Sequence, residues 1–505
     1  MSKINQLKAG SMMSYFQIMA GLVISLIYTP VMLRMLGQAE YGVYSIAAGA
    51  ISYLTILNFG FGSSYIRFYS RDKAEGIDTA STNGLFLSVF VVLGLVCLVA
   101  GFIVTFFADL VFDKGLTPEE VITLKRIMVI LTVSTSATLA STVFASIITA
   151  HEKFIFQKGI NILKTLLSPF VTWILLLLGF RSVAMALVTA SITVLVDLFN
   201  IVYCLVVLKV RFSFSSLDFK KLKEVGAFSA FIALNSVIDQ INWHVDKLIL
   251  GRYCGSVVTA VYSLSSYINT LYSQVSTSIS TVFIPRVNRL VANGASSDQL
   301  TGLFSRIGRY QLMILLPIVL GFIFLGQAFV SIWAPAGYED VYVIGLLLII
   351  PATIPYMQNI GISIQTAMAK HKARAVVYTV MAFVNFIISI PLAKAFGGIG
   401  SALGTAISLI LGNGIFMNIY YHKIIGLNII CYWKSMISFL PTIIISSICG
   451  FLINQFAVVN NYFQLFVYII IFVIIYALSA FKYTLNADEK NMFLSVIRKV
   501  IRRSR

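Results

Sequence analysis

The hydrophobic pattern of this chain repeats itself after about 215 residues, and this repeat limits the possible folds more than any other feature. Residue pairs recur at offsets of 214 to 217: Leu7-Lys8 as Leu222-Lys223, Leu36-Gly37 as Leu250-Gly251, Thr149-Ala150 as Thr366-Ala367, and Ala186-Leu187 as Ala402-Leu403. One such pair is a chance event, but four that keep one offset indicate an internal repeat. Each copy contains about six apolar segments, which predicts two six-helix bundles.

The composition places these bundles in a membrane. The chain of 505 residues is 59% apolar and only 11% charged, with a mean hydropathy of +0.91, whereas soluble domains carry about twice that charged fraction. Segments long enough to cross about 30 Å of hydrocarbon lie near residues 12–33, 42–62, 83–107, 121–149, 158–178, 182–208, 224–250, 258–282, 306–331, 341–367, 374–394, 398–420, 434–455 and 462–482. We therefore predict an all-α, polytopic membrane protein with 14 transmembrane helices.

The repeat also predicts the organisation of the chain. We expect an N-terminal six-helix bundle over residues 1–215 and a C-terminal one over 216–423, followed by helices thirteen and fourteen over 424–484. Six is an even number, so the two bundles are expected to be parallel. Residues 485–505 begin with a capping-box pattern, Asn486 to Glu489, and predict an amphipathic helix on the membrane surface.

The net charge of +18 is interpreted as a topology signal. Of the 37 Lys and Arg residues, 29 fall at one set of helix ends and 8 at the other, so both termini are expected to be cytoplasmic. No soluble module concentrates these charges, so no nucleic-acid partner is expected. The chain has no P-loop, no catalytic motif and no CxxC pair among its five Cys, so we expect neither an enzyme, a bound cofactor nor a metal centre.

The seventh predicted helix carries a polar face. Asn235, Asp239, Asn242 and Asp246 follow the spacing i, i+4, i+7, i+11, so they lie along one side, which we expect to line the space between the bundles. Asp239 and Asp246 are candidates for coupling transport to Na⁺ or H⁺; a purely structural hydrogen-bonding role is the alternative. Asn235 and Asn242 could bind a polar substrate.

Basic residues near the helix ends are candidates for binding phosphate, because a guanidinium matches its geometry. The alternative is that they only anchor the helices at the interface. These candidates are Arg34, Arg67, Lys247, Arg252 and Arg286.

The beginning of the chain resembles a known family. Leu7-Lys8-Ala9-Gly10, the run from Pro30 to Gly37, Glu40-Tyr41-Gly42-Val43-Tyr44 and the run from Asn58-Phe59-Gly60 to Arg67-Phe68 are similar to the opening of the bacterial polysaccharide repeat-unit (O-antigen, Wzx-type) flippases. These belong to the multidrug/oligosaccharidyl-lipid/polysaccharide (MOP) exporter superfamily. Fourteen helices and the two-bundle repeat agree with that resemblance.

The resemblance implies a transporter of the bacterial cytoplasmic (inner) membrane. Members of the family flip undecaprenyl-diphosphate-linked oligosaccharides, for O-antigen or capsular polysaccharide, to the outer leaflet by ion-coupled alternating access. Membrane lipids, a polysaccharide polymerase and a chain-length regulator are the other expected partners. A cation-coupled multidrug antiporter, a lipid II or teichoic-acid precursor flippase and a non-transporting scaffold for glycan assembly stay as alternatives. Lipid II flippases carry arginines in the inner half of helix one, whereas Ser14 to Tyr28 contains none here.

Overall fold

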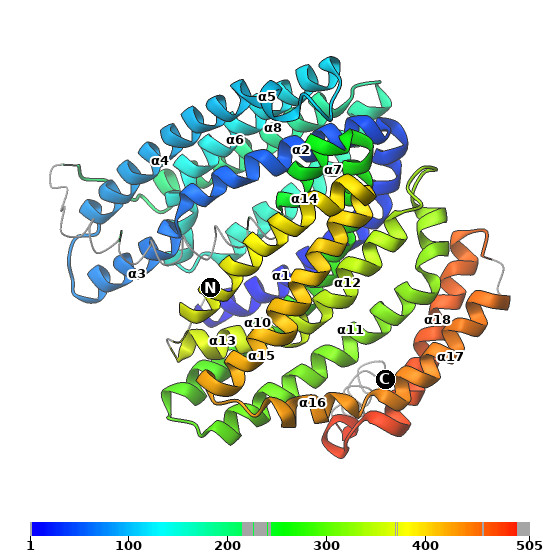
Figure 1. Ribbon diagram of the computed structural model, residues 1–505. Coiled ribbons are helices and arrows are strands. Elements are labelled where there is room, and N and C mark those ends of the chain that lie inside the picture. Colours follow the sequence, from blue (N-terminus) through cyan, green and yellow to red (C-terminus); the bar gives the residue numbers. More distant parts are fainter. Residues whose placement is uncertain are drawn as a thin grey trace, which may run out of the picture. The chain divides into compact units, whose positions relative to one another are not determined.

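The computed structural model of the protein describes residues 3–214, 226, 240, 244–368, 370, 372–456 and 459–491. This part of the chain is almost entirely helical and contains no β-strand, so the predicted all-α class is confirmed (Figure 1). The elements are α1 (Lys3–Leu36), α2 (Gln38–Ser52), η1 (Tyr53–Asn58), α3 (Phe61–Ala74), α4 (Ala80–Phe106), α5 (Ala108–Phe112), α6 (Pro118–Ala150), α7 (Phe154–Leu177), α8 (Ser182–Val202), η2 (Tyr203–Val207), α10 (Gly255–Ala292), α11 (Ser297–Trp333), α12 (Val341–Met357), α13 (Ile360–Ala367), α14 (Lys372–Leu409), η3 (Ile410–Phe416), α15 (Met417–Tyr420), η4 (Tyr421–Ile425), α16 (Ile429–Ile437), α17 (Leu440–Phe456), α18 (Tyr462–Ser479) and η5 (Ala480–Thr484).

The chain forms two compact units. The first combines Met1–Leu264 with Tyr378–Thr405, and the second combines Ser265–Val377 with Ala406–Arg505. These units are defined by contacts in space, whereas the bundles predicted above are defined by a sequence repeat. The predicted boundaries at residues 215, 423 and 484 therefore stay a prediction.

The structure contains apolar helices that are long enough to span a membrane, as predicted, but the count of fourteen is not confirmed. Among the described residues, nine helices are long and apolar enough to cross a bilayer, or eleven if each of two bent helix pairs is one span. One of the nine runs over Arg374–Ile425, and its 52 residues exceed the roughly 20 that a bilayer needs. The backbone turns inside it at Gly397, whose φ of 57° suits glycine. Most of the span expected at 224–250 lies outside the described residues.

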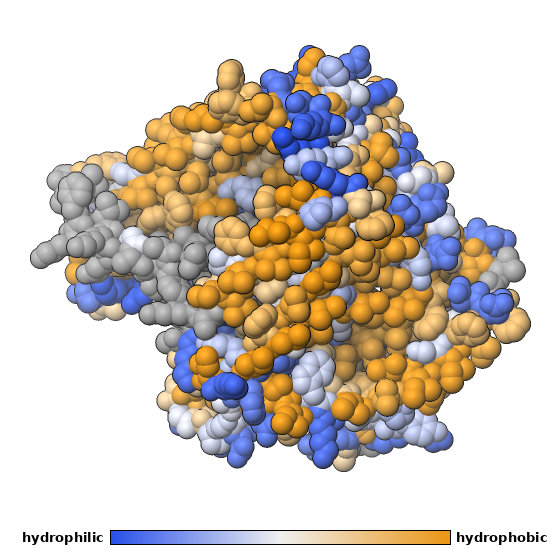
Figure 2. Space-filling model, in the orientation of Figure 1, coloured by the Kyte–Doolittle hydropathy of each residue, from blue (hydrophilic) through white to orange (hydrophobic). Residues whose placement is uncertain are grey.

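The surfaces of the units are those of a membrane protein. Side chains that a soluble domain would bury are exposed along α4 and α17, and orange apolar atoms cover both helices in Figure 2. On α4 they include Val92, Leu95, Val99 and Phe106, and on α17 Ile444, Ile448 and Phe451. The chain is therefore a multi-pass membrane protein.

Close helix packing forms the core of the first unit. There α6 packs between α4 and α8 and also contacts α2, while α1 packs on α7 (Figure 1). Ile46 of α2 and Leu124 and Ile127 of α6 are fully buried in this core. A Cβ at Gly42 would lie 1.9 Å from the carbonyl oxygen of Ser256, so only glycine allows this approach.

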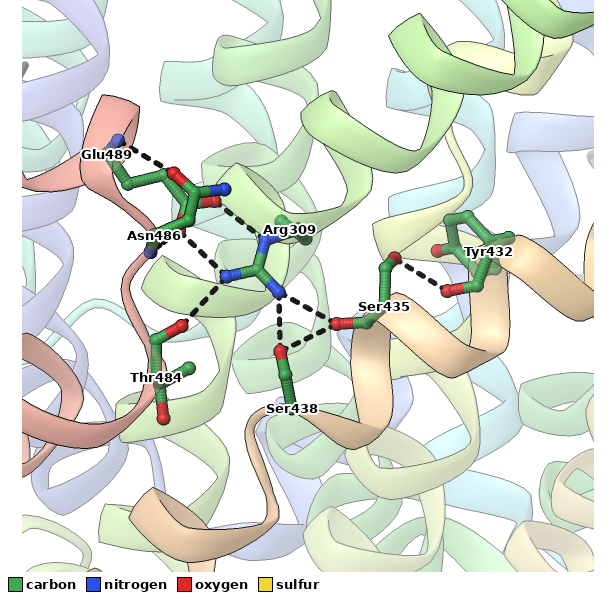
Figure 3. Close-up of polar contacts among 7 residues, drawn as sticks. All are labelled: Arg309, Tyr432, Ser435, Ser438, Thr484, Asn486 and Glu489. Atoms are coloured by element: carbon green, nitrogen blue, oxygen red, sulfur yellow. Dashed lines mark hydrogen bonds and ion pairs between the residues drawn. The ribbon is translucent and has the colours of Figure 1, made fainter.

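In the second unit, α11 contacts α12, α16, α17 and α18 (Figure 1). Its Arg309 is buried and donates five hydrogen bonds, which uses every donor of a guanidinium (Figure 3). Two go to the Glu489 carboxylate at 2.7 Å each, and the others go to the Thr484 and Ser435 carbonyls and the Ser438 hydroxyl. Arg309 therefore joins α11 to α16 and to the chain that follows α18.

Glu489 is itself held by the predicted capping box. The Asn486 N–H donates to Glu489 Oε2, and the Glu489 N–H donates to Asn486 Oδ1, both at 2.9 Å. The capping box is therefore confirmed, whereas residues 492–505 of the predicted amphipathic helix lie outside the described residues.

We expect Glu489→Gln to destabilise the protein. It leaves the buried Arg309 charge without its counterion, and breaking a buried pair in this way costs about 3–5 kcal/mol. The neighbouring Asp488 is exposed, so Asp488→Asn is the matched control. Thermal unfolding of the detergent-solubilised variants checks this, and equal unfolding temperatures for the two would contradict it.

Candidate functional site

A buried carboxylate is the centre of the most polar site within the first unit. Asp246 lies in a helical segment that includes residues 244–253, and it is 2% exposed. Three hydroxyls donate to it: Tyr262 at 2.7 Å, Ser401 at 2.7 Å and Thr405 at 2.9 Å. Neutral hydroxyls therefore supply the hydrogen bonds of this buried carboxylate.

A buried amide extends this site. Asn385 Oδ1 accepts from the Ser389 hydroxyl at 2.9 Å and lies 3.4 Å from the Thr405 hydroxyl. Asn385 and Ser389 belong to one half of α14 and Thr405 to the other, so the turn at Gly397 brings the two halves together. We name Asp246, Tyr262, Asn385, Ser389, Ser401 and Thr405 the Asp246 cluster.

The chemistry of the Asp246 cluster is that of an oxygen-rich site. Its side chains supply one carboxylate, one amide oxygen and four hydroxyls, all within the first unit. Hard cations prefer such oxygen ligands, and a carboxylate can also hold a proton. The described residues include no group of three His, Cys, Asp or Glu that could bind a transition metal.

A second set of polar atoms lies close to the Asp246 cluster. Tyr53 and Asn58 on η1, together with Gln240 and His244, each have a buried polar atom without a hydrogen-bond partner among the described residues. Gln240 Nε2 donates to Thr55 Oγ1 at 3.1 Å, which joins the segment to η1. Buried polar atoms are normally paired, so an unpaired group of this kind is a favourable place for water or a polar ligand.

The second span is broken beside these atoms. The α-helix changes to a 3-10 segment at Tyr53, and Phe59 and Gly60 then take positive φ values of 45° and 70° before α3 begins. Such discontinuous helices in transporters occur where backbone lines a polar site. This break falls on Asn58-Phe59-Gly60, one of the motifs of the family resemblance.

Four of the five predicted basic residues lie in the first unit, and one lies in the second. Arg34 is exposed in the last turn of α1, and Arg67 is exposed near the other end of the following span. Arg252 donates to the carbonyls of Leu110 and Val111 at 3.1 and 2.5 Å, so it holds the end of α5. Arg286 is exposed on α10 in the second unit. Lys247 is half-buried beside Asp246.

Of the predicted polar face, only Asp246 belongs to the part of the chain that the structure describes. Asn235, Asp239 and Asn242 lie outside the described residues. Asp246 is found in the interior of the first unit and not on an open surface, because three hydroxyls from α10 and α14 enclose it. A further intramembrane carboxylate, Asp197 of α8, accepts from Thr138 of α6 at 2.7 Å.

The four hydroxyl-bearing members of the Asp246 cluster were missed at the level of sequence, whereas the amide of Asn385 was one of several Asn and Gln side chains considered for sugar hydroxyls. Two of the pairs follow the spacing i, i+4, namely Asn385 with Ser389 and Ser401 with Thr405, and each lies within an apolar span. Paired polar residues on one face of an apolar helix are the signal that could have identified them. Tyr262 carries no such signal.

Helical spans with a broken segment next to buried polar groups are an arrangement found in membrane transporters. The fold agrees with two solved transporters. The lipid II flippase MurJ in an inward closed conformation aligns with a TM-score of 0.71 at 18% identity, covering 93% of this chain and 97% of that one. An inward-facing multidrug resistance MATE family transporter of the MOP superfamily aligns at 0.57 and 16% identity, covering 86% and 99%.

The sequence comparisons give the family. A profile described as "Polysaccharide biosynthesis protein" matches residues 8–291, more than half of the chain, and the protein belongs to that family. A putative O-antigen transporter of Shigella flexneri is 22% identical over 398 residues, which is 75% of this chain and 89% of that protein. The resemblance stated from the sequence is thereby confirmed, and the chain has the fold of transporters of the MOP superfamily.

Proposed function

We propose that the protein is a flippase for an undecaprenyl-diphosphate-linked oligosaccharide, a repeat unit of an O-antigen or a capsular polysaccharide. In this proposal it lies in the bacterial cytoplasmic membrane with both termini in the cytoplasm, and it moves the glycolipid to the outer leaflet by alternating access. A polymerase would use the translocated glycolipid, and a chain-length regulator is the other proposed partner.

The observation that carries the proposal is the family match over residues 8–291, on a chain that has the fold of MOP transporters. Residues 8–291 include the broken second span, with the unpaired buried atoms of Tyr53 and Asn58, and also the unpaired atoms of Gln240 and His244. Sugar hydroxyls could pair with such atoms, because each both donates and accepts. Arg34 and Arg67 stand near opposite ends of the span, so each is proposed to contact the diphosphate at a different stage of the cycle.

We further propose that the Asp246 cluster couples transport to Na⁺. Its carboxylate and five neutral oxygens are more ligands than a bare proton needs, whereas an ion that has lost its water needs several oxygens. Binding would require the hydroxyls of Tyr262, Ser401 and Thr405 to turn their lone pairs toward the ion. Coupling to H⁺ is the alternative for the same carboxylate, and Asp239 stays a candidate for a second coupling site.

We expect Na⁺ to raise the free energy of unfolding of the protein, because it would bind the folded state. A ligand that binds only the folded state stabilises it by about 1.4 kcal/mol for each tenfold excess over its Kd. The unfolding temperature of the purified protein should therefore rise in NaCl relative to choline chloride at the same concentration. Asp246→Asn should lose this rise, whereas Asp113→Asn, at an exposed loop position, should keep it.

Equal unfolding temperatures of the wild-type protein in the two salts would contradict Na⁺ binding. A rise that persists in Asp246→Asn would place the ion elsewhere in the chain.

Transport itself is tested in proteoliposomes. We expect the purified protein to move an undecaprenyl-diphosphate oligosaccharide across the bilayer, measured as the loss of accessibility to a membrane-impermeant glycosidase or lectin. Lipid II and a fluorescent organic cation, added to parallel samples, represent the lipid II flippase and the drug antiporter. Movement of the cation alone would overturn the proposal in favour of an antiporter, movement of lipid II alone would favour the lipid II alternative, and no movement of any substrate would favour the scaffold.

A further inference from the structure

An open apolar pocket lies in the first unit, away from the Asp246 cluster. Its volume is about 950 Å³, and its walls come from the end of α4, the start of α6 and the first turn of α8. Val99, Phe102 and Phe106 of α4 and Val129 of α6 line it, and all four are exposed in the protein. Because this surface belongs to a membrane span, the natural content of the pocket is hydrocarbon.

Two cations stand at the wall of this pocket. Lys125 of α6 forms an ion pair with Asp109 of α5, so its charge is compensated. Arg126 follows it, is exposed, and has no hydrogen bond or ion pair within the part of the chain that the structure describes. The pocket therefore combines an apolar wall with one uncompensated guanidinium.

Arg126 lies in the first third of the 33-residue helix α6. It follows the first residue of the helix, Pro118, by eight residues, which is about 12 Å along the axis. An arginine beside hydrocarbon is costly unless its charge meets water or an anion, and phosphate accepts two parallel hydrogen bonds from a guanidinium.

We propose that this pocket binds an anionic phospholipid, with one acyl chain between α4 and α6 and the phosphate on Arg126. Charge complementarity selects this occupant: a neighbouring apolar helix would fill the walls but leave the guanidinium unpaired. The lipid would bind at the periphery of the first unit and would not be the transported substrate. This inference is independent of the function proposed above.

The test is native mass spectrometry of the delipidated full-length protein, titrated with phosphatidylglycerol or phosphatidylcholine of the same chains. We expect at least one phosphatidylglycerol to bind more tightly than phosphatidylcholine. Arg126→Gln should weaken its binding about tenfold, as the loss of a charged hydrogen bond implies. Lys114→Gln removes the same charge from the exposed loop before α6, outside the pocket, and should bind as the wild type does.

A second variant tests the pocket and not the charge. Val129→Trp puts an indole into the apolar wall and should exclude the acyl chain while Arg126 is retained. Equal binding of the two lipids, or unchanged binding in both variants, would overturn the proposal. Tighter binding of undecaprenyl phosphate, with displacement of phosphatidylglycerol in the wild type and not in Arg126→Gln, would also overturn it, because the pocket would then belong to the glycolipid.

Discussion

The absence of water from the bilayer core is the constraint on which this structure depends, because each polar group in a span must find its partner within the protein. Asp246 and Arg309 show two solutions. Asp246 accepts hydrogen bonds from three neutral hydroxyls, whereas Arg309 pairs with the Glu489 carboxylate and donates to three further acceptors. Glu489 gives Arg309 a counter-charge, whereas the Asp246 cluster contains no basic side chain.

This difference separates the contacts of Arg309, which hold helices together, from those of Asp246, for which we propose a role in ion coupling. The Arg309 pair uses every guanidinium donor and joins α11 to α16 and the chain after α18, so it fixes helices of the second unit to one another. The Asp246 cluster can exchange hydroxyl donors for a cation without separating an ion pair, which would cost several kcal/mol. The unpaired atoms of Tyr53, Asn58 and His244 mark the neighbouring region as one that can accept a polar ligand.

Much of the fold was predictable because membrane insertion imposes a period and a length on the sequence. The apolar segments, the helical class and the capping box at Asn486 and Glu489 follow from local rules. The partners of Asp246 did not, since Tyr262, Ser401 and Thr405 reach it only through the packing of α10 and α14, which makes long-range contacts. The predicted polar face shows the same difficulty. Helical spacing places Asp246 on one face of its helix, but the burial of its side chain depends on residues of α10 and α14. The positions of Asn235, Asp239 and Asn242 stay predictions.

We propose that Asp246 exchanges its hydroxyl donors for an ion during transport. The most direct measurement is ²²Na⁺ flux in the same proteoliposomes in which glycolipid movement is counted, for the wild type and Asp246→Asn. We expect Na⁺ to move only when the glycolipid moves, and we expect Asp246→Asn to lose both the ion flux and gradient-driven flipping. Glycolipid movement at the wild-type rate in Asp246→Asn, with the same response to a Na⁺ gradient, would contradict it.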